Sequence, residues 1–302
     1  MLRHVSTHSL STRATWSLVS FRPFSQAVSP AFDASAAQER QRERRRKERA
    51  EAAPTIGIEG TTEYYTRQLV VVDPEASAPT SWPKKIEFSD HVVATYVKAA
   101  IAAGENPKFS ALKTIAATPF PVATCGLEPS PSQEEPLPDT MTHDLLIFPD
   151  GIRVHGLGLD QAYQINGLGW HLTLPFFCSN LSFQPLAPGH HILVCAHESR
   201  DERCGCNGPK LLQWLQRVGV ERQVPVHLYS ASHFGGHRYA ANCIAYPSGD
   251  WFGLLNEPHD ADALIAALEA KQPLRLHTQW RGRLTMTKEE QIQTLRDAVA
   301  KA

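Results

Sequence analysis

Residues His191–Arg217 read HILVCAHESRDERCGCNGPKLLQWLQR, and this stretch decides the fold. It begins with the short apolar run His191–Val194, which predicts a strand that ends at Cys195. The residues that follow are largely polar and predict a loop leading to Cys204. From Pro209 onward the leucines have helical spacing, which predicts an amphipathic helix. The stretch therefore predicts one cysteine at the end of a rigid strand and a second one close by.

Two histidines further along the chain add to these cysteines. Ser232–Arg238 reads SHFGGHR, so that His233 and His237 flank a pair of glycines. The glycines disfavour a helix, and they allow the backbone to approach a bound group closely. Two thiolates and two imidazoles suffice for one metal centre, and thiolate selects zinc, copper or iron–sulfur. The candidate ligands are therefore Cys195, Cys204, His233 and His237.

The spacing of the cysteines separates the kinds of metal site. Structural zinc motifs usually hold their cysteines close together in sequence, whereas Cys195 and Cys204 are far apart, so a zinc knuckle is disfavoured. A Rieske centre is an alternative because Cys195 is followed by His197, but the second half of that motif is absent. A thiol oxidoreductase using Cys204 and Cys206 also stays open, although this pair is tighter than C-x-x-C. Cys206 remains an alternative metal ligand.

The predicted loop between the cysteines has a second property. A loop of this length can direct backbone N–H groups at sulfur, which raises the reduction potential of a bound cluster. Arg200 and Arg203 lie in it and are interpreted either as charge compensation for a thiolate-bound cluster or as solvated surface.

Composition excludes several classes of protein. The chain has 302 residues and a net charge of −1, so no basic field indicates nucleic-acid binding. No apolar run approaches the roughly 18 residues of a membrane span. Three of the six cysteines lie close together, which favours a metal or redox site over structural disulfides. We expect Cys125, Cys178 and Cys243 to be small buried hydrophobic residues.

The N-terminus has the composition of a mitochondrial presequence. Arg3, Arg13 and Arg22 are present and no acidic residue precedes Asp33. A processing site after Phe24 defines the expected presequence, residues 1–24. A charged segment, 25–55, follows; its interleaved glutamates favour a solvated linker over an RNA-binding arm.

A first α/β domain is expected over residues 56–185. Gln68–Asp73 predicts a buried strand, and Asp90–Gly104 predicts a helix with Asp90 as its N-cap and Gly104 at its end. Leu145–Gly156 predicts a hairpin around Pro-Asp-Gly, preceded by a loop at residues 126–140.

A second domain is expected over residues 186–302. Val224–Tyr229 predicts a strand, and Ala241–Gly253 predicts a hairpin around Pro-Ser-Gly. Asp260–Lys271 and Thr287–Ala302 predict amphipathic helices. Alternating strands and helices indicate an α/β layer fold.

The two predicted hairpins resemble each other. Ile147–Gly151 aligns with Ala245–Gly249, and Gly-Leu follows in both. One interpretation is a duplicated domain whose first copy lacks the ligands, which makes the N-terminal domain a degenerate copy. Chance similarity between two turns is the alternative.

Three motifs together resemble the sucrase/ferredoxin-like family, in particular its fungal altered-inheritance-of-mitochondria members. They are Cys195–Gly205, Ser232–Asn242 and Tyr246–Gly253. The resemblance implies a thioredoxin-like ferredoxin fold in the C-terminal domain. It also implies a [2Fe–2S] cluster held by Cys195, Cys204, His233 and His237. Cys206 is a departure that leaves open which cysteine of the pair binds iron.

These expectations combine into a function. The chain is interpreted as a mitochondrial, preferably matrix, [2Fe–2S] protein that transfers electrons or senses redox state. Because two histidines replace two cysteines, its potential should exceed that of a four-cysteine ferredoxin and should depend on pH. The expected partners are a redox protein and the iron–sulfur assembly machinery. A zinc-stabilised interaction module and a thiol–disulfide oxidoreductase remain alternatives. No catalytic carboxylate pair is found, so the chain is more an electron carrier than a stand-alone enzyme.

Overall fold

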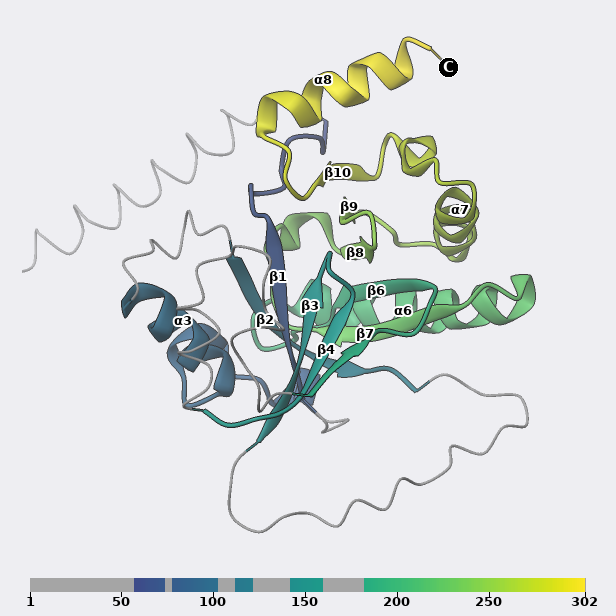
Figure 1. Cartoon of the computed structure of the whole chain (residues 1–302). Helices are drawn as coiled ribbons and strands as arrows, with labels where there is room; N and C mark the ends of the chain where they lie inside the picture. Colours follow the sequence, from purple (N-terminus) through teal and green to yellow (C-terminus); the bar gives the residue numbers. More distant parts are fainter. Residues whose placement is uncertain (1–56, 74–77, 103–111, 122–141, 160–181, 302) are drawn as a thin grey trace, which may run out of the picture. The chain divides into compact units, whose positions relative to one another are not determined.

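The computed structural model describes residues 57–73, 78–102, 112–121, 142–159 and 182–301 (Figure 1). The expected presequence and charged segment lie outside these ranges, as do the loop 126–140, Cys125 and Cys178. Residues 56–302 form one compact unit. In the described part of the chain, no helix is long and apolar enough to cross a membrane.

Ten strands among the described residues form one sheet, in the order β10-β9-β8-β6-β7-β2-β1-β3-β4-β5. Along the chain they are β1 Arg67–Val72, β2 Leu112–Pro119, β3 His143–Phe148, β4 Ile152–Leu157, β5 Ser182–Pro185, β6 His190–Cys195, β7 Val226–Ala231, β8 Cys243–Tyr246, β9 Asp250–Phe252 and β10 Trp280–Arg283. The helices are α2 Ala78–Ser81, α3 Val92–Ala102, α6 Glu202–Arg222, α7 Pro258–Glu269 and α8 Lys288–Val299, with short 3-10 turns η1 Ile86–Phe88, η2 His237–Tyr239 and η3 Pro273–Leu276.

The second half of the chain has a thioredoxin-like arrangement of strands. Strands β6 and β7 are parallel and are connected by α6, whereas β8 pairs antiparallel with β6 and β9 pairs antiparallel with β8. The resulting order is β7-β6-β8-β9, with α6 and α7 packed together. The predicted α/β class and the thioredoxin-like fold are therefore confirmed.

The first half repeats this topology. Strands β1 and β2 are parallel, and α3 lies between them in the chain. Strands β3 and β4 follow as an antiparallel hairpin, which gives the order β2-β1-β3-β4. The two hairpins turn alike: the N–H of Gly151 donates to Ile147 over 3.0 Å, and that of Gly249 donates to Ala245 over 2.8 Å. Both glycines have positive φ, 67° and 70°. Shared strand order and turn geometry support a duplication over chance similarity.

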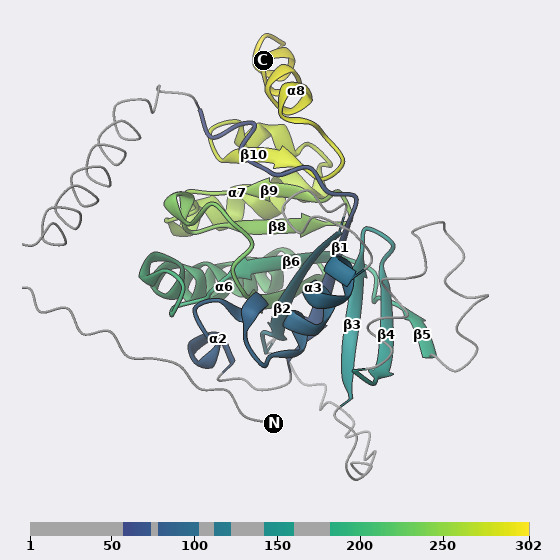
Figure 2. The ribbon, with the colours of Figure 1, turned by 90° about the vertical axis from the view of Figure 1, so that its left-hand side faces the viewer.

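The two halves join at one edge of each. Strand β2 pairs antiparallel with β7 through the register Ala117↔Ala231, Thr118↔Ser230 and Pro119↔Tyr229. Figure 2 shows β3 and β4 beside β6, β8 and β9 and at a steep angle to them. The division into domains at residue 185 stays a prediction, and both expected domains contribute to one sheet.

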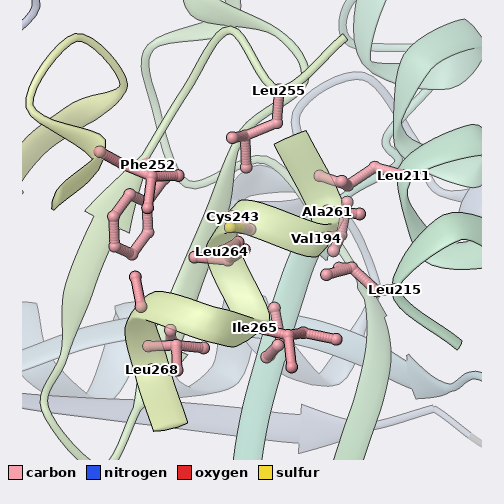
Figure 3. Packing of buried hydrophobic residues seen from close by; sticks show 14 of the residues in the cluster. Val194, Leu211, Leu215, Cys243, Phe252, Leu255, Ala261, Leu264, Ile265 and Leu268 are labelled. Atoms are coloured by element: carbon pink, nitrogen blue, oxygen red, sulfur yellow. The ribbon is translucent and has the colours of Figure 1, made fainter. Parts of the chain in front are cut away.

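Alternation along the strands decides which face each residue covers. In β6, Ile192 and Val194 face α6 and α7, where they meet the apolar side chains of those helices (Figure 3). Leu193 and Cys195 face the other way, into a cluster shared with the first half. In this central cluster, the rings of Phe148 and Tyr246 stack with their centroids 4.1 Å apart. The two halves of the sheet thus pack face to face.

Cys243 belongs to the cluster beneath α7, as Figure 3 shows. Its side chain is fully buried, and burial raises the pKa of its thiol. It behaves as the small hydrophobic residue that was expected.

Several predicted helix boundaries are wrong, among them the start of α7, which lies at Pro258 and not at Asp260. Helix α6 begins at Glu202, not at Pro209, because the Asp201 side chain accepts a hydrogen bond from the N–H of Arg203 and caps the helix. Helix α3 begins at Val92, two residues after the expected start, and there the His91 side chain accepts from the N–H of Val93. Cys204 therefore lies on the first turn of α6 and not in a loop.

Candidate metal centre

The cysteine pair is assembled by a close approach of α6 to the end of β6. Cys195 is the last residue of β6, and Cys204 lies on the first turn of α6. Gly208 makes this approach possible, since a Cβ there would lie 2.3 Å from the carbonyl oxygen of Cys195. Both cysteines are buried, and their thiols are hydrogen-bonded to each other.

The histidines lie on the loop that follows β7. His233 contacts the thiol of Cys204, and its ring centroid lies 5.2 Å from that of His237. In the part of the chain that the structure describes, the Nδ1 atoms of both rings are buried and have no hydrogen-bond partner. A buried polar atom without a partner is costly, so these two nitrogens are available to bind a ligand. The contacts connect Cys195, Cys204, His233 and His237 in a row.

Cys206 is placed differently. It lies two residues after Cys204 on α6, and its side chain is exposed to solvent. The structure brings Cys204, and not Cys206, against Cys195.

Backbone N–H groups point at the first sulfur, as the sequence led us to expect. The N–H groups of His197 and Phe234 donate to the sulfur of Cys195. Such hydrogen bonds stabilise a thiolate and raise the reduction potential of a cluster bound to it.

His197 is a supporting residue whose role the sequence did not identify. Its Nδ1 accepts from the N–H of His233 over 3.1 Å, and its Nε2 lies 3.2 Å from the carbonyl oxygen of Pro83. Its ring packs edge-on against Trp82. Burial lowers the pKa of His197 to about 4, which keeps the ring neutral and able to accept at Nδ1. The first half of the chain thereby helps to orient the histidine loop.

Arg281 of β10 is the second residue that the sequence did not identify. Its side chain is 1% exposed and lies near Cys195. It donates to Thr61 Oγ1, to Asn242 Oδ1 and to the carbonyl oxygen of Gly235. Burial lowers its pKa to about 10, so the guanidinium remains charged at neutral pH. It both fixes the glycine loop and places a positive charge beside the sulfur.

Asp201 connects the start of α6 with the histidine loop. Its carboxylate accepts two hydrogen bonds of 2.9 Å from Arg203, and its Oδ2 lies 3.8 Å from His237 Nε2. The hydrogen bond from Arg203 lowers the pKa of Asp201 to about 2. Arg203 therefore compensates Asp201, which revises its expected role beside the cluster.

The thiols differ in their tendency to ionise. The hydrogen bond between the two thiols lowers the pKa of Cys195 and raises that of Cys204. Cys195, which accepts N–H groups and lies near Arg281, is therefore the first to become a thiolate.

The donor set fits a thiolate and imidazole centre, although the cage is not closed. Among the described residues, no three or more His, Cys, Asp or Glu side chains are arranged as a finished metal site. The fit rests instead on the paired thiols and on the two buried Nδ1 atoms without partners. Thiolate and imidazole together suit zinc or an iron–sulfur cluster.

Comparison of the whole chain with known proteins identifies the family to which it is similar. The sucrase/ferredoxin-like family matches residues 58–282. A relative from Meyerozyma guilliermondii, "Altered inheritance of mitochondria protein 32", is 32% identical over 96 residues, which cover 30% of this chain and 33% of the relative. Its counterpart from Eremothecium gossypii is 25% identical over 250 residues, covering 69% of this chain and 75% of that protein. The matched segment thus spans about a third of the first relative.

Among solved structures, a thioredoxin-like [2Fe–2S] ferredoxin from Aquifex aeolicus aligns with a TM-score of 0.28 and 16% identity. The alignment covers 32% of this chain and 94% of the ferredoxin. The family match, in contrast, covers most of the described residues and contains all four candidate ligands. The chain therefore belongs to the sucrase/ferredoxin-like family.

Proposed function

We propose that this chain binds a [2Fe–2S] cluster through Cys195, Cys204, His233 and His237 and serves in one-electron transfer or redox sensing. The observation that carries the proposal is the pair of buried Nδ1 atoms without partners beside two buried, touching thiols. The names and titles of the comparison proteins, a [2Fe–2S] ferredoxin and mitochondrial-inheritance proteins, agree with it.

When bound, the cluster supplies a site that gains or loses one electron. The residues of this chain set the conditions for that change. The N–H groups of His197 and Phe234 and the charge of Arg281 stabilise negative charge on the sulfur of Cys195. The central apolar cluster excludes water from the same side of Cys195. The N–H groups and the charge of Arg281 favour the more negative, reduced state and so raise the potential, whereas the exclusion of water acts in the opposite direction.

We further propose that the chain works in mitochondria, in the matrix rather than the intermembrane space. The arginine-rich, acid-free composition of residues 1–24 and the names of the relatives support this location. A matrix location would give access to the iron–sulfur assembly machinery, which is the expected source of the cluster. The expected second partner is a redox protein.

The first test is a visible absorption spectrum of anaerobically purified full-length protein, before and after dithionite. We expect charge-transfer bands between roughly 320 and 600 nm that bleach on reduction. A colourless protein that contains stoichiometric zinc and takes up no iron on reconstitution would contradict the proposal.

One observation favours a second candidate, a thiol–disulfide function. The thiols that touch are those of Cys195 and Cys204, so a disulfide would form between these residues and not between Cys204 and Cys206. Thiol titration of metal-free protein, with mass spectrometry of the cross-linked peptides, distinguishes the pairs. A reversible Cys195–Cys204 disulfide in a protein that never binds iron would establish this candidate.

A further inference from the structure

The four candidate ligands differ in their access to solvent. Cys195 is 1% exposed and Cys204 is fully buried, whereas the side chain of His237 is 45% exposed. An electron that moves to or from a bound cluster has a shorter route to solvent through an exposed ligand such as His237 than through either buried cysteine. The route therefore leads through His237.

Basic side chains surround this route. Arg200 and Arg203 both act on His237 through their charge. Arg203 forms an ion pair with Asp201, whereas Arg200 forms no ion pair within the described residues. Arg200 donates a hydrogen bond to the carbonyl oxygen of Lys84 over 3.1 Å. That hydrogen bond places the Lys84–Lys85 segment beside the site.

Arg238 follows His237 in the chain and adds a further positive charge to the same loop. It is exposed, and its guanidinium lies 4.6 Å from the ring centroid of Tyr239, which holds it in place. Like Arg200, it makes no ion pair with any described residue. We call Lys84, Lys85, Arg200, Arg203 and Arg238 the basic face.

The acidic residues of the same segments are fewer. Glu198 and Glu202 are exposed nearby, Glu87 lies on η1 just after Lys85, and Asp201 is neutralised by Arg203, so five basic residues stand against four acidic ones. The local balance is positive, although the whole chain has a net charge of −1. Local and overall charge thus have opposite signs, which makes the basic face testable.

Exposed apolar side chains flank the basic face. Phe88 is 71% exposed and follows Lys85 on η1. Leu254 is 43% exposed, and its N–H donates to the carbonyl oxygen of Tyr239 over 2.7 Å. Charged and apolar groups around an exposed redox ligand suit a small, transient protein interface.

We propose that electrons pass through His237 across the basic face, and that the partner that docks there is an acidic redox protein. This inference rests on the proposed function. In the transfer step one electron leaves the reduced centre and converts a ferric acceptor to the ferrous state, and no atom passes between the two proteins. The basic face attracts the acidic partner and raises its rate of encounter.

The test uses two haem proteins as one-electron acceptors, the acidic cytochrome b5 and the basic cytochrome c. Dithionite-reduced full-length protein is mixed with each acceptor in a stopped-flow instrument over a series of salt concentrations. We expect the rate with cytochrome b5 to fall as salt rises, and the rate with cytochrome c to rise or stay level. The opposite pattern, which the net charge of the chain alone would produce, overturns the proposal.

A double variant tests the residues. Arg200→Gln with Arg238→Gln should slow the reaction with cytochrome b5 by about 3- to 10-fold at low salt and have little effect at high salt. The matched control is Arg217→Gln with Arg296→Gln, which removes the same charge elsewhere; Arg217 lies roughly 20 Å along α6 from Cys204. Equal slowing in both variants would refute the basic face.

Equilibrium binding separates this inference from the proposed function. Calorimetry of oxidised cytochrome b5 with the full chain needs no electron transfer and no cluster. Salt-sensitive binding that the double variant weakens supports the docking face even if the protein is colourless. A coloured protein that does not bind cytochrome b5 at low salt contradicts the docking face and leaves the cluster proposal intact.

Discussion

Cys204 and Cys206 lie two residues apart on one helix and have opposite surroundings. Because helix positions two residues apart point in different directions, only one of them can face Cys195. Cys204 is buried against that residue, and Cys206 faces solvent. The sequence alone assigned Cys204 but left Cys206 open as an alternative, because it did not show that the helix begins before them.

The first prediction follows from this difference. Cys204→Ala should abolish the visible absorption of the reconstituted protein, because it removes a buried thiolate from the donor set. Cys206→Ala should retain the spectrum and the iron content of the wild type. Loss of colour in Cys206→Ala with retention in Cys204→Ala would reverse the ligand assignment.

Arg281 supports the second prediction. Arg281→Gln removes a buried positive charge near Cys195, so reduction should become harder and the midpoint potential should fall. Arg281→Lys keeps a charge but loses the forked contacts to Thr61, Asn242 and Gly235, so it should recover part of the potential. Spectroelectrochemical titration measures both. Identical potentials in wild type and Arg281→Gln would rule out the electrostatic role.

The ligand types could be predicted from the sequence because cysteine and histidine carry their chemistry in the residue itself. The supporting residues could not. Arg281 is one arginine among many and acquires its role only when β10 brings it against the glycine loop. Arg203, for which charge compensation of a cluster was one interpretation, instead pairs with Asp201.

At the scale of elements, the contact between α6 and β6 determines whether the two thiols meet. Gly208→Ala would place a methyl group against the carbonyl of Cys195, and backbone cannot yield as a flexible side chain can. We expect lower stability, by about 1–3 kcal/mol, and faster loss of the cluster. Thermal unfolding and the decay of visible absorption measure the two effects.

Lys210→Ala is the matched control for this variant. Lys210 lies two residues further along α6 and is exposed, so its replacement should change neither property appreciably. A Gly208→Ala protein that is as stable as this control would show that α6 tolerates a wider spacing.

The contact between α3 and β3 predicts a dependence of stability on pH. His143 is buried, and its Nε2 lies 2.7 Å from the hydroxyl of Tyr96. Burial lowers the pKa of His143 to about 4, whereas the unfolded chain has a histidine pKa of about 6.5. As pH falls below the higher value, the unfolded state takes up the proton first. Stability should therefore be full above pH 6.5 and decline towards pH 4.

The neutral His143 ring contributes up to about 3 kcal/mol to the free energy of unfolding above pH 6.5. His143→Gln should flatten the loss of unfolding free energy between the two pKa values. His259→Gln, at a side chain that is 80% exposed, is the control and should leave the slope unchanged. Urea unfolding at a series of pH values measures the slopes, and equal slopes for all three proteins would exclude His143.

Strand and hairpin positions could be predicted well, because alternating apolar residues and Pro-x-Gly turns are local signals. Helix starts were less certain. At the starts of α3 and α6, the His91 ring and the Asp201 carboxylate accept hydrogen bonds from nearby backbone N–H groups. A short sequence pattern does not show which of several polar residues will cap a helix in this way.

At the scale of the molecule, the two halves bury one another. The central cluster takes side chains from both, including the stacked rings of Phe148 and Tyr246. We expect residues 186–302, expressed alone, to be less stable and less soluble than the full chain, because the face that carries Leu193 and Ile244 would be open to water. Circular dichroism and sedimentation measure this outcome. A soluble, monomeric fragment with full-length stability would contradict it.

The repeated topology could be suspected from the two hairpins, but the packing between the repeats could not be foreseen. Each strand read as an independent pattern, and nothing local showed that Val70 and Leu193 meet in one cluster. Contacts between residues so distant in sequence depend on the whole arrangement of strands.

The pairing of β2 with β7 has a consequence for self-association. These strands hold equivalent places in the two repeats, and each covers the edge that the other would leave bare. A molecule that opened there would expose two unpaired strand edges of matching geometry, which are templates for another chain. Two opened molecules could exchange halves and close again as an intertwined dimer with every backbone contact restored. The β2–β7 pairing, which leaves neither strand with a bare edge, is also the place where the chain can pair with a second copy of itself.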